Sequence, residues 1–114
     1  MFRVKDPRGR NVILKKSIWK GHITDKRPEL VPYLPNLRRT IKDPDIITES
    51  KKCSDCEFFI RASEIRSGSF KYMNIVAVVE WIKKDPYEGL VKTAYITPET
   101  RGGKVKWQRP MNRP

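Results

Sequence analysis

Short apolar blocks separated by turn-forming residues make up the first part of the chain. Residues 2–5 (FRVK) alternate apolar and basic side chains, and residues 12–14 (VIL) resume the apolar pattern after a turn that contains Pro7 and Gly9. Two extended segments joined by such a turn predict a β-hairpin over residues 2–14.

Helical spacing replaces alternation after Ser17, a residue type that often caps the start of a helix. Apolar side chains then recur at three- and four-residue spacing, so we expect a short amphipathic helix over 18–26. Three prolines follow and exclude one regular helix over 28–35. The last of them, Pro35, is well placed as the first residue of another helix over 35–42.

The second half of the chain favours strands, because β-branched and apolar runs alternate with polar turns. The predicted strands cover residues 46–49, 57–62, 72–82 and 90–97. A hairpin, then helices, then strands joined by short loops are typical of an α+β fold. We expect an N-terminal hairpin and two or three short helices packed on an antiparallel sheet of about four strands.

The length of 114 residues indicates a single domain over 1–114, with a basic, flexible tail over 101–114. No apolar run approaches the roughly 18 residues of a membrane span, and the first residues lack the apolar stretch of a secretory signal. We therefore expect a cytoplasmic protein with no membrane partner, whose two cysteines are free thiols. The sequence leaves the oligomeric state open.

The net charge of +12 is concentrated at the two ends of the chain. Residues 1–20 hold seven basic residues and one acid, residues 101–114 hold five basic residues and no acid, and together they carry +11. A localised basic surface favours RNA as a partner, because each neutralised phosphate releases counterions; a general role in solubility is the alternative. The residues that we expect to bind nucleic acid, with the tryptophans stacking on bases, are Arg8, Arg10, Lys15, Lys16, Trp19, Lys92, Lys106 and Trp107.

His22 is the only histidine and the first candidate for acid–base chemistry, because imidazole readily exchanges a proton near neutral pH. The alternative is a histidine that simply packs beside Trp19 on one face of the helix. Arg27 follows at the end of the same predicted helix, and its guanidinium matches the oxygens of a phosphate in a transition state. Glu29 is either a second acid–base group or a charge that favours a helix N-terminus.

Three hydroxyl groups lie on one face of the predicted strand 90–97, at Thr93, Tyr95 and Thr97. Beside a basic tail they would hold a phosphodiester, although β-propensity alone also accounts for Thr and Tyr in a strand. A Gly-Gly pair then precedes Lys104, where the backbone can approach a phosphate closely and the amine would supply charge.

Cys53 and Cys56 form a CxxC pair in a predicted turn between strands. A zinc site needs four ligands, and these two cysteines and one distant histidine do not supply them, so we expect no intrachain zinc site. A metal shared between two chains remains an alternative, and an oxidisable turn is the interpretation that we favour. No dinucleotide-binding, nucleophile-elbow or metalloprotease motif is present, so we expect no cofactor.

Taken together, these segments resemble a known family. VKDPRGRNVIL, IWKGHITDKRPEL, IKDPDIITES, VKTAYIT and GGKVKW follow one another in the order found in small phage and bacterial domains related to the barnase, EndoU, colicin and RelE ribonucleases. The resemblance implies helices packed on a curved antiparallel sheet, and RNA cleavage through the 2′-hydroxyl without a metal. The family's longer His-x-x-Arg-His-Pro-Glu form has a second histidine where this chain has Arg27.

The resemblance also implies roles for matching residues. His22 would act as the base or acid, Arg27 and Lys104 would stabilise charge, and Tyr95 or Thr97 would position the phosphate. We therefore expect a metal-independent ribonuclease of toxin or phage-effector type, with an acidic antitoxin or immunity protein as a partner. The alternatives are a non-catalytic nucleic-acid-binding module of the same fold, and a structural or interaction protein with an acidic partner.

Overall fold

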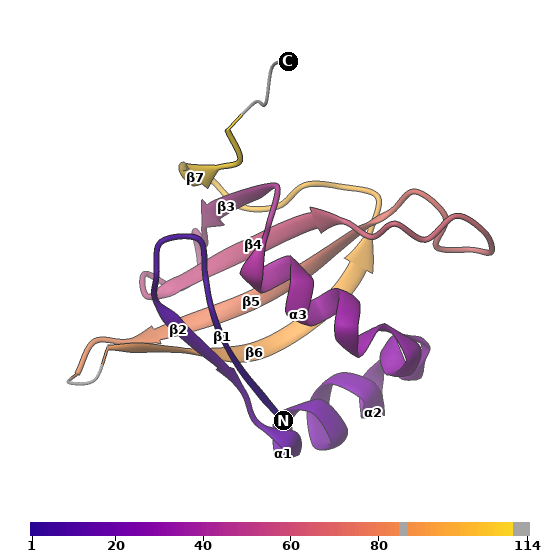
Figure 1. Ribbon diagram of the computed structural model, residues 1–114, viewed down its shortest axis with the longest axis horizontal. Helices are drawn as coiled ribbons and strands as arrows, with labels where there is room; N and C mark the ends of the chain where they lie inside the picture. The colour runs from indigo at the N-terminus through magenta and orange to yellow at the C-terminus, as the bar shows by residue number, and fades with distance from the viewer. Residues whose placement is uncertain (85–86, 111–114) are drawn as a thin grey trace.

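The strands of this chain form one mixed sheet of seven strands, with α3 lying across one of its faces (Figure 1). The computed structural model describes residues 1–84 and 87–110. The strands are β1 (Phe2–Lys5), β2 (Asn11–Leu14), β3 (Ile46–Glu49), β4 (Cys56–Ala62), β5 (Asn74–Ile82), β6 (Glu88–Thr97) and β7 (Val105–Gln108).

The α+β class is confirmed, but the predicted antiparallel sheet of about four strands is wrong. The strand order is β1-β2-β6-β5-β4-β3-β7, and β2 pairs with β6 in the parallel direction while the other pairs are antiparallel. The N-terminal hairpin therefore extends the sheet instead of packing on it. The sequence pattern identified most strands, but it does not reveal the partner of a strand that pairs far along the chain.

The predicted helices are confirmed, with one addition. A continuous helical segment comprises α1 (Lys16–Ile18), a π-helical turn (Trp19–Ile23) and α2 (Thr24–Lys26). A 3-10 segment (Pro28–Tyr33) carries the prolines, and α3 (Leu34–Lys42) begins one residue before its expected start. Among residues 1–84 and 87–110, no helix combines the length and the hydrophobicity that crossing a bilayer requires.

A bulge in β6 decides which side chains share a face of the sheet. Val78 lies opposite Thr93, whereas the next residue, Val79, lies opposite Val91, so Lys92 is skipped. One face carries the core residues Ile75, Ala77, Val79, Phe59 and Ala94, which pack with Leu37 and Ile41 of α3. The opposite face, here called the distal face, carries Glu80, Val78 and Val76 of β5 and Leu90, Thr93 and Tyr95 of β6.

The helical segment 16–26 lies along the part of β6 that β2 leaves unpaired. The pairing of β2 covers only Glu88–Leu90 of β6. Trp19 and Ile23 of the helical segment are buried in the core, while Ile18 and His22 are partly exposed. One short segment therefore closes the core and also presents side chains at the edge of the distal face.

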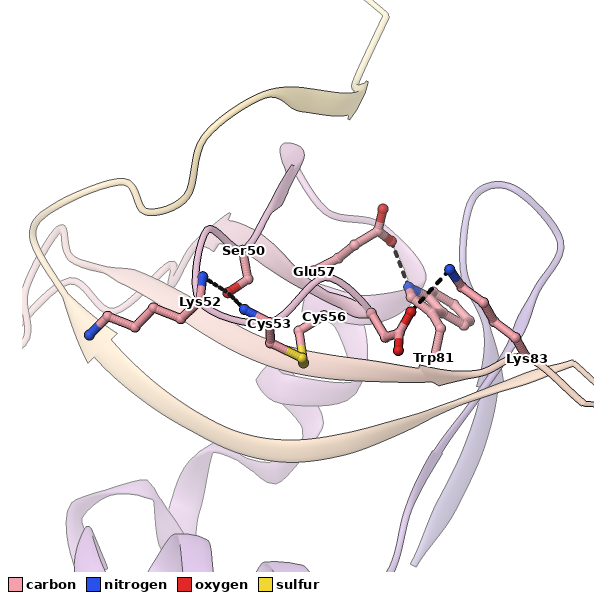
Figure 2. The surroundings of a disulfide bond; sticks show 8 residues. Ser50, Lys52, Cys53, Cys56, Glu57, Trp81 and Lys83 are labelled. Carbon is pink, nitrogen blue, oxygen red and sulfur yellow. Dashed lines mark hydrogen bonds and ion pairs between the residues drawn. A yellow bond between two sulfur atoms is a disulfide. The ribbon is translucent and has the colours of Figure 1, made fainter.

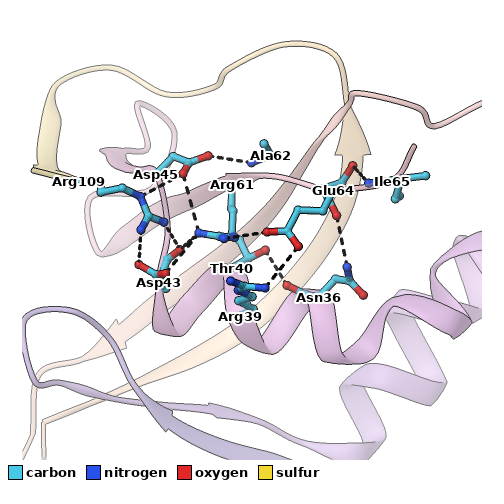
Figure 3. Close-up of polar contacts among 11 residues, drawn as sticks. Asn36, Arg39, Thr40, Asp43, Asp45, Arg61, Ala62, Glu64, Ile65 and Arg109 are labelled. Atoms are coloured by element: carbon cyan, nitrogen blue, oxygen red, sulfur yellow. Dashed lines mark hydrogen bonds and ion pairs between the residues drawn. The ribbon is translucent and has the colours of Figure 1, made fainter. Parts of the chain in front are cut away.

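The C-terminal segment is anchored to the far edge of the sheet, where β7 pairs with β3. Arg109 forms ion pairs with Asp43 at 2.8 Å and Asp45 at 3.3 Å, and Arg61 contacts Asp43 and Glu64 nearby (Figure 3). The predicted flexible tail thus contains a strand, and its residues 111–114 lie outside the described residues.

A buried ionic cluster joins the N-terminal hairpin to the centre of the sheet. The Arg8 guanidinium donates to Glu57 at 2.7 Å and lies 3.0 Å from Asp6, and the Trp81 indole N–H donates to Glu57 at 2.7 Å (Figure 2). Burial alone would raise the pKa of Glu57, but the hydrogen bonds from Arg8 and Trp81 and the Arg8 charge outweigh it and lower that pKa.

We predict that Glu57→Gln destabilises the fold by about 2 kcal/mol at neutral pH, because it removes the charge-assisted hydrogen bonds that Glu57 accepts from the partly buried Arg8, which keeps only Asp6 as a charge partner. Since the folded-state pKa of Glu57 is lowered, its stabilisation is present at neutral pH and is lost as the pH falls through that pKa. Urea unfolding at several pH values measures this. The difference in the free energy of unfolding between wild type and variant should become smaller as the pH falls. The control Glu49→Gln removes an exposed pair with Lys106 and should change stability by at most about 1 kcal/mol.

Candidate active site

His22 lies in a pocket of about 390 Å³ at the junction of the helical segment and the distal face. The π-helical turn places it one turn beyond Ile18, and the Thr24 hydroxyl donates to the Trp19 carbonyl at 2.9 Å within the same turn. Turns of this kind are frequent at functional sites. The side chains that line the pocket are Ile13, Lys15, Ile18, His22, Glu80, Leu90, Val91 and Lys92.

Glu80 is one of the site residues that sequence reasoning missed, and Arg101, described below, is another. Glu80 is the acidic residue within the long apolar run of β5, and that exception to the pattern was the signal that could have revealed it. No ion-pair partner of Glu80 occurs within the part of the chain that the structure describes. The pocket therefore holds an imidazole and a carboxylate, with the cations Lys15 and Lys92 also in its lining.

Tyr95 lies beside two guanidinium groups further along β6. The Cζ atoms of Arg27 and Arg101 lie 5.7 and 5.9 Å from the centroid of its ring, and Arg27 donates to the Thr93 hydroxyl at 3.4 Å. Tyr95 and Arg101 also line a pocket of about 330 Å³ with Lys51, Lys52, Ser50, Phe58 and Gly102.

The loop that carries Arg101 is held firmly against β3. The Thr48 hydroxyl donates to the Arg101 carbonyl at 2.6 Å, and the Gly103 N–H donates to the Glu49 carbonyl at 2.9 Å. Gly102 has φ +91° and lies so close to Thr48 that any Cβ at this position would collide with it. The position of the Arg101 backbone is therefore set by packing as well as by hydrogen bonds.

Tyr95 is held in its protonated form. Burial raises the pKa of its phenol above the ordinary value, and the charges of Arg101 and Arg27 offset only part of that rise. At neutral pH the phenol is therefore a hydrogen-bond donor that lies among cations, an arrangement that suits an anionic ligand.

The family follows from a match over almost the whole chain. Residues 2–108 match the model described as phage-Barnase-EndoU-ColicinE5/D-RelE like nuclease2. The chain belongs to this nuclease-like family. No curated protein and no solved structure matches it. The resemblance drawn from the sequence is confirmed.

Neither pocket is lined by three of the residues that we expected at the site of this nuclease-like domain, Trp19, Thr97 and Lys104. Trp19 is only 5% exposed and packs in the core, so its ring offers no face to a base. Thr97 is buried, and its hydroxyl accepts the N–H of Glu99. Lys104 is exposed in the β6–β7 loop, where its carbonyl accepts the N–H of Glu49 at 2.9 Å.

The two basic ends form the edge strands β1 and β7, yet Arg8 and Arg10 line one pocket of about 360 Å³ together with Lys106. Arg8 is held inside the ionic cluster with Glu57, whereas Arg10 lies over the rings of Trp81 and Tyr87 at 5.3 and 5.4 Å. At the other end, Lys106 pairs with Glu49 at 3.6 Å, and Trp107 packs partly buried against the core. Lys16, in α1, is exposed.

The CxxC pair forms a disulfide, so the expectation of free thiols is wrong for this structure (Figure 2). Cys53 lies in the turn between β3 and β4, and Cys56 is the first residue of β4; their Cα atoms are 5.2 Å apart. The same turn carries Lys51 and Lys52, which line the pocket of Tyr95. The disulfide therefore lies beside the candidate anion site.

We predict that the Tyr95 phenol titrates above the range of free tyrosine, because burial disfavours the phenolate. Tyrosine ring resonances followed by NMR against pH, with Tyr95→Phe for assignment, test this directly. Arg101→Gln should raise this pKa further, since it removes a charge that favours the phenolate. Lys71→Gln removes an amine that lies over Tyr72 instead, and should leave the Tyr95 titration unchanged. Titration of Tyr95 below free tyrosine would contradict the arrangement.

Proposed function

We propose that this nuclease-like domain is a ribonuclease that cleaves RNA by attack of a 2′-hydroxyl on the adjacent phosphodiester. The observation that carries the proposal is the shared pocket of His22 and Glu80, on the same sheet face as the Arg27–Tyr95–Arg101 cluster. Membership of the family supports nuclease chemistry in general.

Cleavage of this type needs one group that removes the 2′-hydroxyl proton and another that protonates the leaving 5′-oxygen. His22 and Glu80 are the two groups in one pocket that can exchange protons in these steps. The carboxylate would serve as the base and the imidazolium as the acid, or the roles would be reversed. The products are a 2′,3′-cyclic phosphate and a free 5′-hydroxyl.

Arg27, Arg101 and Tyr95 are proposed to hold a neighbouring phosphate of the same RNA strand, because Tyr95 lies too far along β6 from the His22 pocket to reach the phosphate under attack. Guanidinium groups match phosphate oxygens, and a neutral phenol adds a hydrogen bond to the same anion. Along β6, Thr93 lies between Tyr95 and Lys92, and Lys92 lines the His22 pocket. A strand rises roughly 3.3 Å per residue, so Leu90 at the His22 pocket and Tyr95 are about 15 Å apart along β6. The RNA backbone would therefore follow β6.

The cations around these pockets would hold neighbouring phosphates. Lys15 and Lys92 lie at the first pocket, and Lys51 and Lys52 lie at the second. An acidic antitoxin or immunity protein, if one accompanies the chain, would bind this same basic face. The proposal includes a cytoplasmic location and RNA as the natural target.

Cleavage of total RNA and tRNA in the presence of EDTA tests the proposed reaction. We expect fragments that end in a 2′,3′-cyclic phosphate, and no cleavage when the attacking nucleotide carries a 2′-deoxyribose. His22→Gln and Glu80→Gln should each lower the rate by about 10²- to 10⁴-fold, the usual contribution of a general acid or base. Lys20→Gln, an exposed change on the same helical segment, should have little effect.

The outcomes separate the two main interpretations. Equal rates for His22→Gln and wild type would remove His22 from the mechanism. An absence of cleavage of every RNA, with RNA binding preserved, would indicate a binding module of the same fold. An absence of both cleavage and binding at low salt would remove RNA as the substrate.

We predict that Arg27→Gln and Arg101→Gln each weaken RNA binding. Each should reduce the slope of log affinity against log salt by about 0.7, the value for one phosphate contact on a single strand. Fluorescence anisotropy over a range of salt concentrations provides the measurement. Arg39→Gln removes a cation that pairs with Glu64 on the α3 side of the sheet, and should leave the slope unchanged (Figure 3).

A further inference from the structure

The turn between β3 and β4 places two cysteine sulfurs beside the carboxylate of Glu80. Cys56 is the first residue of β4 and lies directly opposite Glu80 of β5 in the antiparallel register. The sulfurs of Cys53 and Cys56 and a carboxylate oxygen of Glu80 all lie within 4.8 Å of one another. The sequence offered two cysteines and a distant histidine, whereas the strand register supplies a third ligand.

We propose that reduction of the Cys53–Cys56 disulfide creates a binding site for a thiophilic divalent cation such as Zn²⁺. The ligands are the two cysteine thiolates and Glu80. Zinc binds thiolate and carboxylate ligands in tetrahedral sites, and three protein ligands leave the fourth position for water. Harder cations such as Mg²⁺ prefer sets of oxygen ligands and would bind poorly here.

Hydrogen bonds hold the conformation of the turn alongside the bond between the sulfurs. The Cys56 N–H donates to the Cys53 carbonyl at 3.1 Å, the Ser50 N–H donates to the Cys56 carbonyl at 3.1 Å, and the Ser50 hydroxyl accepts the N–H of Cys53 at 3.3 Å (Figure 2). These bonds keep both sulfurs on one side after reduction. A tetrahedral zinc ion needs them roughly 3.8 Å apart, which side-chain rotation can provide at a Cα separation of 5.2 Å.

The charges around the turn suit this ligand set. Asp55, the other carboxylate of the turn, is paired with Lys83 at 3.0 Å, whereas Glu80 has no ion-pair partner among the residues that the structure describes (Figure 2). Two thiolates and a carboxylate leave the zinc complex with one net negative charge. The exposed Lys51 and Lys52 of the same turn offset that charge.

Formation of the site takes two balanced steps. A phosphine reductant first breaks the S–S bond; the phosphine gives up two electrons and becomes a phosphine oxide, and water supplies its oxygen and the two protons that end on the sulfurs. A dithiol reductant does the same by exchange and leaves as its own disulfide. The cation then displaces both thiol protons, forming two bonds to sulfur and one to the Glu80 oxygen.

Co²⁺ titration of the full chain tests the site, because cobalt–thiolate bonds absorb in the near ultraviolet. We expect one Co²⁺ per phosphine-reduced chain with this absorption, its displacement by one equivalent of Zn²⁺, and no absorption from the oxidised chain. Cys53→Ser should abolish it. Glu80→Gln should weaken Co²⁺ binding by roughly tenfold or more. Loss of a side chain that only hydrogen-bonds to a metal ligand already has an effect of this size, and loss of the ligand itself should have at least as large an effect.

Matched carboxylate variants identify the third ligand. Asp55→Asn changes the turn itself, and Glu49→Gln changes β3 beside it; both should bind Co²⁺ as wild type does. Circular dichroism before titration confirms that each variant is folded. Reduced wild-type protein without cobalt–thiolate absorption would overturn the site, and equal affinities of Glu80→Gln and wild type would remove Glu80 from it.

A second readout rests on the proposed function, because Glu80 also lines the pocket of His22. Zn²⁺ should slow RNA cleavage by the reduced chain and should not slow cleavage by Cys53→Ser. Cobalt binding without any RNA cleavage would refute the proposed ribonuclease and leave the metal site standing. RNA cleavage without cobalt–thiolate absorption would refute the metal site alone.

Discussion

The register of β6 against β5 is the constraint on which the rest of the candidate site depends. Without the bulge at Lys92, strict alternation would place Leu90 and Thr93 on opposite faces, three residues apart. With it, Leu90, Thr93 and Tyr95 all face the same way as Glu80. One inserted residue thus keeps the core face apolar beneath α3 and collects the polar groups on the distal face.

That face becomes usable because the parallel pairing of β2 ends at Leu90 of β6. The helical segment 16–26 lies along the strand beyond this point, and its π-helical turn carries His22 into the pocket that Glu80 lines. Arg27, at the end of the same segment, reaches Thr93 and the ring of Tyr95. If β2 paired with β6 beyond Leu90, the helical segment could not lie there, and the side chains of His22 and Arg27 would be excluded from the site.

Local patterns sufficed for most of the elements, for the family and for the choice of His22, Arg27 and Tyr95 as candidates. They could not give the partners of strands, so β7 and the parallel β2–β6 pair were missed. Neighbours across strands are equally invisible to them: Glu80 joins His22, and also the cysteines, only through pairing with distant residues. Trp19 and Thr97 show the converse, since residue types suited to RNA contact are buried by packing that no local pattern reveals.

The distribution of charge along the chain also differs from its distribution in the folded protein. The chain ends carry most of the net charge, yet many of their cations pair with acids from the middle of the sequence. The pairs between an end and the middle, among the described residues, are Arg3–Glu88, Arg8–Glu57, Arg101–Glu99, Lys106–Glu49, Arg109–Asp43 and Arg109–Asp45. The middle segment has a net charge of only +1, and the ends neutralise part of its acids. Its own cations Arg27, Lys51, Lys52 and Lys92 provide much of the positive charge on the distal face. The basic ends therefore act largely through the acids that they neutralise, and the site draws most of its charge from the segment that looked neutral.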